Sequence, residues 1–419
     1  LAPEEGATIV DATGKLVLPG AIDAHTHLAT LCGNIVSADD YFTGTRAASC
    51  GGTTTVFDFA MQETGERLTD CASRRRALCE GNACVDYAFH VGVRDISGDL
   101  LDSLDACIQS GVSSFKMYMV YDFGVTDDVL YRMLEETKKH GALLQLHAEN
   151  RDLIALLTRR HLAQGLTTPW YHYGSRPEFV ESEAISRAIL LAQNAGAPLY
   201  IVHLACAQGM EAVLRARNAG QRVYAETCPQ YLHFTHEVYR RPDGRNFDCS
   251  PSIKGQDSQD ALWHGIQIGA IDTVATDHCP FQQAEKDLGN EDFSKIPNGC
   301  AGIEILYPYM LSEATKGRIS YCKAVALCAT NVAHIFGCDA TKGSIIPGKD
   351  ADLVLYDPAL QVTIHNHQLH GNNDHTIWEG VALSGYPVQT YSRGALVYDH
   401  GRFVGRRGDG RFVPCAPLR

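Results

Sequence analysis

The chain has 419 residues, enough for a large core, and its 45% hydrophobic and 20% charged residues are typical of a soluble globular protein. Its formal net charge of −13 argues against a nucleic-acid partner, because no basic surplus is available to meet phosphates. No apolar run approaches the length of a membrane span, and the first residues lack the basic and apolar segments of a secretion signal. The 15 cysteines are scattered without a CxxC pair, which favours free thiols in a reducing cytoplasm over a disulfide framework.

Short apolar runs alternate with helical patterns through most of the chain. The predicted strands are, in chain order, TTTVFDF near Val56, YAFHVGV from Tyr87, SSFKMYM around Lys116, ALLQLHAE around His147, LYIVHLA around His203, RVYAETC around Glu226 and IDTVATDH around Asp277. Strands that alternate with helices imply a parallel sheet, and about eight such units predict a closed (β/α)8 TIM barrel.

Amphipathic segments lie between these strands. Apolar residues repeat with helical spacing over Asp127–His140, where we expect Thr126 to cap the start and Gly141 the end. The segments ESEAISRAILLAQNAG and QGMEAVLRARNAG have the same pattern, and each closes in glycine.

The two ends of the chain differ from the middle, because they carry short alternating strands and turns without clear helices. These ends read LAPEEGATIVDATGKLVLPG at the start, and GSIIPGKDADLVLYDPALQVTIHN and QTYSRGALVYDHGRFVG near the finish. We predict a small β-sandwich built from residues 1–18 and 343–419, flanking a catalytic barrel over residues 19–342.

Several predicted strands end in a side chain that could bind a metal ion. His25 and His27, in IDAHTH, point to the same side of an extended segment. His147, His203 and Asp277 end later strands, and strand ends converge on the active-site face of an α/β barrel. A single histidine in a strand is more often a hydrogen-bonded core residue. Together, however, these residues favour a site for zinc or a similar divalent ion, with more ligands than one ion needs.

Lys116 stands alone as a charge within the apolar run VSSFKMYMVYD, where an unpaired ammonium is costly to bury. Two metal ions about 3.5–4 Å apart would need a bridging anion. Burial and neighbouring cations lower the pKa of a lysine, and the neutral amine can add carbon dioxide to form a carbamate. The alternative is a strand-end lysine that extends to solvent.

Motifs along the whole chain carry a resemblance to a known family. They are LPGAIDAHTH, SSFKMYMVY, LHAEN, YIVHLA, AETCPQYL, VATDHCPF, IPNG and GSIIPGKDADLVLYD. From about Asp11 to the C-terminus they closely resemble the cyclic amidohydrolases, and within them the hydantoinase/dihydropyrimidinase branch. The resemblance implies a barrel that holds two divalent ions, usually zinc.

The implied metal ligands are His25, His27 and Asp277 for the more buried ion, His147 and His203 for the other, and a carboxylated Lys116 that bridges both together with a hydroxide. The implied reaction is hydrolytic opening of a cyclic diamide, either a 5-substituted hydantoin to an N-carbamoyl amino acid or a dihydropyrimidine. Asp277 would take a proton from the hydroxide and pass it to the leaving nitrogen.

The resemblance also implies residues that contact the substrate. The Tyr121 hydroxyl would face the developing oxyanion, and Ser250 and Asn298 would hold the amide edge of the ring. Without the resemblance, Tyr121 would be read as a core aromatic residue and the other two as turn residues.

Three loops are expected to shape the pocket around the ring substituent: Leu28–Val36, the loop after Asp58, and Tyr118–Gly124. We predict that Leu31, Tyr118 and Phe123 line it. The segment DDYFTGTRAASCGGTTT is similar to bacterial phenylhydantoinase-type enzymes, which favours bulky hydantoins and D-selectivity.

Three related classes fit less well. Dihydroorotases place an arginine directly after the HxH motif, whereas Leu28 follows His27 here. Allantoinases and dihydroorotases often read CPHYL, whereas this chain has Gln230 in CPQYL. The non-enzymatic collapsin response mediator proteins have lost metal ligands that this chain retains. The resemblance further implies a homotetramer, or at least a dimer, that acts on a small molecule. The cysteine pattern favours the cytoplasm, and the charge and hydropathy argue against a nucleic-acid or membrane partner.

Overall fold

The computed structural model describes residues 8–97 and 100–418, so residues 1–7 of the predicted N-terminal segment 1–18 lie outside the described residues. Within them, eight parallel strands form one sheet in the order β11-β10-β9-β8-β7-β6-β5-β2. These strands are β2 (Ala21–Thr26), β5 (Thr53–Met61), β6 (Asp86–Gly92), β7 (Ser114–Tyr118), β8 (Leu143–His147), β9 (Leu199–Ile201), β10 (Val223–Thr227) and β11 (Thr273–Val274).

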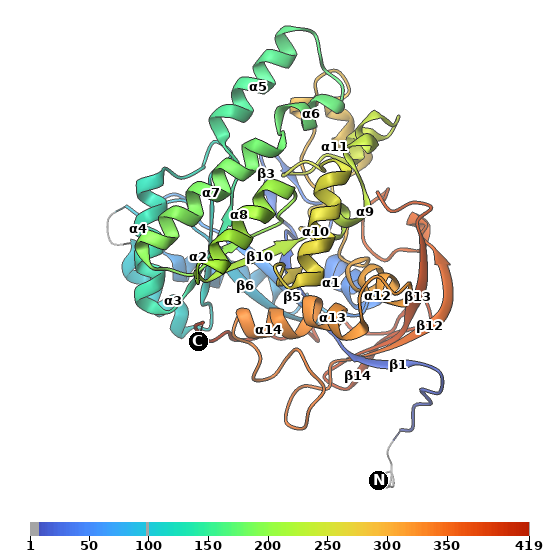
Figure 1. Ribbon diagram of the computed structural model, residues 1–419. Helices are drawn as coiled ribbons and strands as arrows, with labels where there is room; N and C mark the ends of the chain where they lie inside the picture. The colour runs from blue at the N-terminus through green and yellow to red at the C-terminus, as the bar shows by residue number, and fades with distance from the viewer. Residues whose placement is uncertain (1–7, 98–99, 419) are drawn as a thin grey trace.

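The two edge strands of this sheet meet and close the barrel. Thr26, at the end of β2, forms a parallel bridge with His278, which follows β11. The His27 N–H also donates a hydrogen bond to the His278 carbonyl over 2.8 Å. The predicted TIM barrel is therefore confirmed, and Figure 1 shows its helices around the strands.

The barrel strands are rich in β-branched and aromatic residues and are buried on both faces, as expected for a parallel sheet that helices cover. The helices are α1 (Tyr41–Cys50), α2 (Leu68–Cys79), α3 (Leu104–Gln109), α4 (Asp127–His140), α5 (Arg151–Ala163), α6 (Trp170–Ser175), α7 (Glu178–Ala195), α8 (Ala207–Asn218), α9 (Pro229–His233), α10 (Gln256–Ile268), α11 (Gln283–Lys286), α12 (Leu306–Thr315), α13 (Tyr321–Val325) and α14 (Asn331–Ile335). In the described part of the chain, no helix is both long and apolar enough to cross a membrane.

Helix α4 has the predicted bounds and ends at Gly141, whose φ of 67° is the left-handed conformation that glycine adopts easily. Thr126 occupies the N-cap position as expected, but its side chain accepts no capping hydrogen bond from the first turn of the helix. Its hydroxyl instead donates a hydrogen bond to Asp128 over 2.5 Å. Gly196 caps the end of helix α7 as predicted, whereas α8 ends at Asn218, two residues before Gly220, and is capped by Ala219.

Both ends of the chain contribute to one antiparallel sheet, in the order β1-β12-β13-β14-β15. Its strands are β1 (Leu16–Pro19), β12 (Leu353–Thr363), β13 (Ala382–Ser392), β14 (Ala395–Asp399) and β15 (Arg402–Phe403). Strand β1 pairs with β12 across more than 300 residues of sequence, with Leu16 opposite Tyr356. The expectation of a small β unit assembled from both ends is confirmed, and Figure 1 shows it beside the barrel.

Lys342 joins this sheet to the barrel. Its side chain is buried and forms ion pairs with Asp86 (2.5 Å), Asp352 (2.7 Å) and Asp350 (2.9 Å). Asp86 is the first residue of β6, so this cluster lies at the N-terminal ends of the barrel strands. The opposite ends of the strands are therefore free to carry a site.

Candidate metal centre

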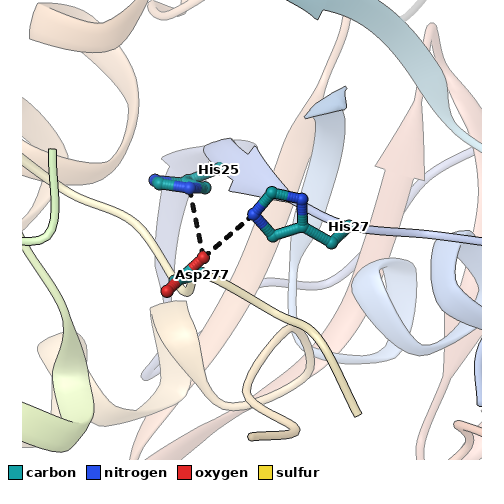
Figure 2. A group of neighbouring side chains, drawn as sticks. All are labelled: His25, His27 and Asp277. Atoms are coloured by element: carbon teal, nitrogen blue, oxygen red, sulfur yellow. Dashed lines mark ion pairs between the residues drawn. The ribbon is translucent and has the colours of Figure 1, made fainter. Parts of the chain in front are cut away.

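His25, His27 and Asp277 meet at the C-terminal ends of the first and last barrel strands. The Nε2 atoms of both histidines lie 3.1 Å from the same Asp277 oxygen, Oδ1, as Figure 2 shows. Asp277 has a φ of 51°, an uncommon conformation for a residue other than glycine, and it turns the carboxylate toward the imidazoles. Burial opposes ionisation, but His25 and His27 hold the pKa of Asp277 well below its ordinary value.

His147 and His203 form a second pair from neighbouring strands. The Nδ1 of His147 faces the Nε2 of His203 over 3.2 Å. The Nε2 of His147 lies 2.7 Å from Glu149, which also accepts a hydrogen bond from Arg176 over 2.6 Å. A proton on His147 Nε2 leaves the lone pair of Nδ1 directed at His203.

Burial keeps this second pair neutral. It lowers the pKa of His147 and lowers that of His203 well below its ordinary value. The buried Nδ1 of His203 has no hydrogen-bond partner among the described residues. Two neutral imidazoles with facing nitrogens are suitable ligands for a divalent ion.

Glu226 connects the two histidine pairs from β10. Its Oε1 lies 2.7 Å from His25 Nδ1 and accepts the His203 backbone N–H over 3.1 Å, while the Tyr200 hydroxyl donates to its Oε2 over 2.8 Å. This carboxylate therefore directs His25 Nε2 into the centre, as a supporting residue of a metal site does. Neither this role of Glu226 nor the similar one of Glu149 was predicted from the sequence. The sequence signal that could have identified both residues is an acidic side chain within or just after a buried strand.

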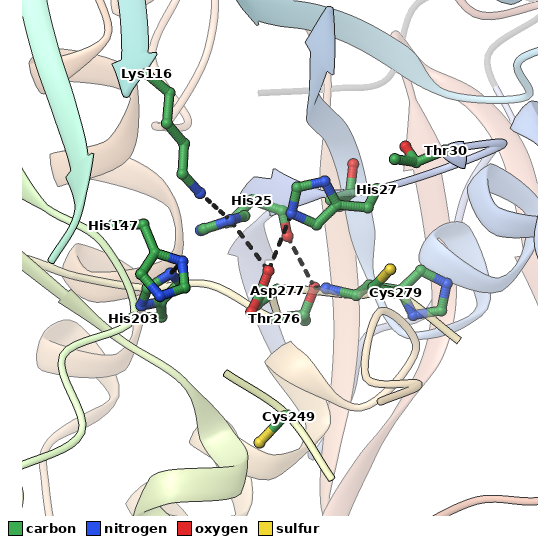
Figure 3. Close-up of polar contacts among 12 residues, drawn as sticks. His25, His27, Thr30, Lys116, His147, His203, Cys249, Thr276, Asp277 and Cys279 are labelled. Atoms are coloured by element: carbon green, nitrogen blue, oxygen red, sulfur yellow. Dashed lines mark hydrogen bonds and ion pairs between the residues drawn. The ribbon is translucent and has the colours of Figure 1, made fainter. Parts of the chain in front are cut away.

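Lys116 lies between the two groups, as Figure 3 shows, and its side chain is buried rather than extended to solvent. Its Nζ is 2.8 Å from His25 Nε2 and 4.3 Å from the ring centroid of Phe59. Burial lowers the pKa of Lys116 to about 8, although the carboxylates of Asp277 and Glu226 oppose this effect. No ion pair joins Lys116 to a carboxylate within residues 8–97 and 100–418.

One atom of the cluster, His25 Nε2, has more neighbours within hydrogen-bond distance than it has protons to donate. His25 Nε2 lies within hydrogen-bond distance of both Asp277 and Lys116, but it can carry only one proton. Ligand atoms of His25, His27 and Asp277 all lie within 4.8 Å of one another, the proximity that a metal ion requires. The donor set therefore fits divalent ions better than it fits a network of hydrogen bonds alone.

A pocket of about 630 Å³ opens onto this centre. All the predicted substrate contacts line it, namely Leu31, Tyr118, Tyr121, Phe123, Ser250 and Asn298. The Ser250 hydroxyl donates to Asn298 over 2.5 Å, and the ring of Tyr121 lies 5.4 Å from that of His147. Burial raises the pKa of Tyr121, so its hydroxyl stays protonated at neutral pH and can donate a hydrogen bond.

Other lining residues were not predicted. The expected loop directly after Asp58 is wrong, because β5 continues to Met61, and it is this last strand residue that lines the pocket. Asp58 itself is buried in an ion pair with Arg75 at 2.8 Å. Arg94 and Cys279 also line the pocket. The signals in the sequence that could have found them are the position of Arg94 just after the strand YAFHVGV and that of Cys279 just after the motif VATDH.

Comparisons with known proteins agree with this geometry. Residues 16–397 match the model of the Amidohydrolase family. The chain is 39% identical over 409 residues to the D-hydantoinase of Ralstonia pickettii, covering 96% of this chain and 90% of that protein. It is 41% identical over 422 residues to the D-phenylhydantoinase of Escherichia coli O127:H6, covering 100% and 92%.

Among solved structures, the dihydropyrimidinase of Brevibacillus agri superposes with a TM-score of 0.97 at 40% identity, covering 99% of this chain and 92% of that one. The family match extends over most of the chain, and the relatives match it nearly from end to end. This chain therefore belongs to the amidohydrolase family.

Proposed function

We propose that this protein is a metal-dependent hydrolase that opens cyclic diamides, with 5-substituted hydantoins as the main substrates and dihydropyrimidines as a second class. The observation that carries this proposal is the centre in which His25, His27 and Asp277 face His147 and His203 across Lys116, together with the pocket that opens onto it. The names of the relatives, D-hydantoinase, D-phenylhydantoinase and dihydropyrimidinase, support this substrate class.

The proposed cofactors are two divalent ions, zinc by the nature of the nitrogen and carboxylate donors. His25, His27 and Asp277 would hold one ion, and His147 and His203 the other. Carboxylation of Lys116 would convert a buried cation, which has no carboxylate partner in the described parts of the chain, into an anion between the two groups. When bound, the ions supply a water nucleophile at neutral pH and positive charge for the developing oxyanion.

The side chains of the pocket would perform the remaining steps. Asp277 is held ionised, so it can accept a proton from the attacking water and deliver it to the leaving ring nitrogen. Tyr121 keeps its proton and would donate a hydrogen bond to the oxyanion. Ser250 and Asn298, already hydrogen-bonded to each other, would hold the amide edge of the ring.

The pocket wall supports a bulky substituent on the ring. Leu31, Tyr118 and Phe123 line it, and the rings of Tyr118 and Phe123 pack edge to face at 5.3 Å. An apolar, aromatic wall favours an aryl or long alkyl group over hydrogen. We propose D-selectivity from the names of the relatives.

The cellular context belongs to the same proposal. All 15 cysteines are free thiols, which supports a cytoplasmic location. The family resemblance supports a homotetramer, and light scattering at micromolar concentration tests it, since a monomer would contradict this assembly. Within the chain, residues 19–342 would form the catalytic unit and residues 1–18 and 343–419 the β unit.

The test compares ring opening of dihydrouracil with that of D- and L-5-phenylhydantoin, together with the metal content of the purified protein. We expect D-5-phenylhydantoin to be opened fastest, close to two divalent ions per chain, and complete loss of activity on strong chelation. Full activity with one ion or none would contradict the two-metal centre. Opening of allantoin or dihydroorotate alone, or of no cyclic amide at all, would favour the related classes with a different function.

A further inference from the structure

The pocket contains a second cation besides Lys116. Among the described residues that line it, Arg94 and Lys116 are the only lysine or arginine side chains. Arg94 is a solvent-exposed residue two positions after β6, and the same pocket is lined by Leu31, Met61 and Phe123. A charged group beside apolar lining residues of a substrate pocket is a candidate for recognition of the substrate.

The backbone of Arg94 is held by a buried side chain. The N–H groups of Arg94 and Asp95 donate to Oε1 of Gln62 over 2.9 Å and 3.0 Å. Gln62 follows β5, is fully buried, and its amide nitrogen donates to the Glu66 carbonyl over 2.8 Å. The start of the loop after β6 is thus fixed to the end of β5.

The side chain of Arg94 packs on the aromatic wall of the pocket. Its guanidinium carbon lies 4.2 Å from the centroid of the Phe123 ring. Phe123 stacks in turn on Tyr121, with ring centroids 5.4 Å apart and planes at 29°. A guanidinium that stacks on a ring keeps its N–H donors in its own plane, where they remain available to an anion.

The charge of Arg94 is not neutralised by the protein. No ion pair joins it to a carboxylate in the described parts of the chain, although Asp122 lines the same pocket. Arg75 and Arg176, by contrast, are paired with Asp58 at 2.8 Å and Glu149 at 2.6 Å. With a net charge of −13, the chain as a whole repels anions, so attraction of an anionic substrate must be local.

We propose that Arg94 makes the substituent end of the pocket a carboxylate-binding subsite. The chain then takes cyclic diamides whose ring substituent ends in a carboxylate, such as hydantoins that correspond to acidic amino acids. This inference rests on the proposed function. A guanidinium can bind the carboxylate through two parallel hydrogen bonds, which an uncharged amide of the same shape cannot accept.

The test uses two substrates of equal shape, 5-(2-carboxyethyl)hydantoin and 5-(2-carbamoylethyl)hydantoin, and the readout is the ratio of their kcat/KM values. We expect the protein to favour the carboxylate by about tenfold. Arg94→Gln should reduce this ratio to one or below, and Arg94→Lys should keep part of it. The ratio should also fall as ionic strength rises from about 0.01 M to about 1 M, because the Debye length shrinks from about 30 Å to about 3 Å.

Arg76→Gln is the matched control, because the Arg76 guanidinium lies 4.5 Å above the Phe412 ring and does not line the pocket. This variant should leave the ratio unchanged. If the protein prefers the amide, or if Arg94→Gln changes both kcat/KM values in the same proportion, the subsite is refuted and Arg94 only supports Phe123. If neither compound is opened but 5-phenylhydantoin is, the subsite fails and the proposed function stands. If no cyclic diamide is opened, the proposed function itself fails.

Discussion

Two buried lysines at opposite ends of the barrel have opposite surroundings. Lys342, 2% exposed, has three aspartate partners between 2.5 and 2.9 Å away. Lys116, 1% exposed, has a histidine nitrogen at 2.8 Å and an aromatic ring, with no carboxylate in ion-pair contact among the described residues. A buried ammonium normally requires such carboxylates. Lys342 therefore has the carboxylate partners that a buried ammonium needs, whereas the environment of Lys116 suits a neutral amine or an anion.

The backbone differs less between the two ends of the barrel. Among the described residues, six other than glycine have a positive φ, and Tyr121, His203 and Asp277 at the metal centre are three of them. Such conformations cost free energy and persist where the surrounding structure imposes them, often at functional sites. At the Lys342 cluster, Asp86 lies in a regular strand, but Arg393, with a φ of 48°, donates its backbone N–H to Asp352 over 2.8 Å. Positive φ angles thus occur at both ends of the barrel, with three near the metal centre and one at the Lys342 cluster.

The largest expected effect is that of Lys116→Ala. We expect kcat/KM to fall by about a thousandfold or more, which is about 4 kcal/mol, because the bridging anion is lost. Bound metal should fall as well, while circular dichroism shows a folded barrel. A short carboxylic acid should restore part of both, whereas Lys116→Arg should not restore activity, because a guanidinium stays protonated. Normal turnover of Lys116→Arg would show that a cation is sufficient at this position, and the proposed difference between Lys116 and Lys342 would be wrong.

Lys342→Met tests the other side of the comparison. Removing this cation leaves Asp86, Asp350 and Asp352 close together, and we expect the free energy of unfolding to fall by about 3–5 kcal/mol. Metal content and the activity of the folded protein should remain unchanged. Urea unfolding of metal-free protein gives the measurement, and Lys116→Met is the matched control, with a much smaller loss. Equal losses of unfolding free energy for Lys342→Met and Lys116→Met would show that the different surroundings of the two lysines do not change their contributions to stability.

Tyr121→Phe tests the catalytic role of a side chain in the pocket at the C-terminal ends of the strands. Loss of a hydroxyl that donates to the oxyanion should lower kcat by about a hundredfold, or about 2.7 kcal/mol, with normal metal content. Tyr118→Phe is the control, because the Tyr118 hydroxyl contacts the sulfur of Met61 at 3.5 Å rather than the centre. Similar kcat values for both variants would assign Tyr121 to the wall of the pocket alone.

The smallest expected effect is that of Glu226→Gln. It weakens the carboxylate that orients His25, so metal affinity should fall by about 10–100-fold, while activity at saturating metal is largely kept. Competition with a chelator measures the affinity. Asp352→Asn, at the Lys342 cluster, should leave metal affinity unchanged and lower the free energy of unfolding instead. Unchanged affinity in Glu226→Gln would limit this residue to its contacts with Tyr200 and the His203 backbone.

The barrel, the β unit from both chain ends and the set of strand-end side chains could all be predicted from the sequence. These features are local, because the apolar period, the glycine at helix ends and the HxH spacing are set by neighbouring residues. Helix α4 has the predicted bounds for this reason. Thr126 stands at the N-cap position as expected, but its hydroxyl donates to Asp128 and accepts no hydrogen bond from the helix.

Only the tertiary structure shows which atoms of these side chains face the metal centre. Glu226 contacts His25 across 201 residues of sequence, and Glu149 directs His147 Nδ1 at His203 with the help of Arg176. It also shows that no carboxylate of the described residues forms an ion pair with Lys116. These contacts depend on the closure of the barrel, which brings distant strands together, and no local pattern in the sequence reports distances between strands that are far apart along the chain.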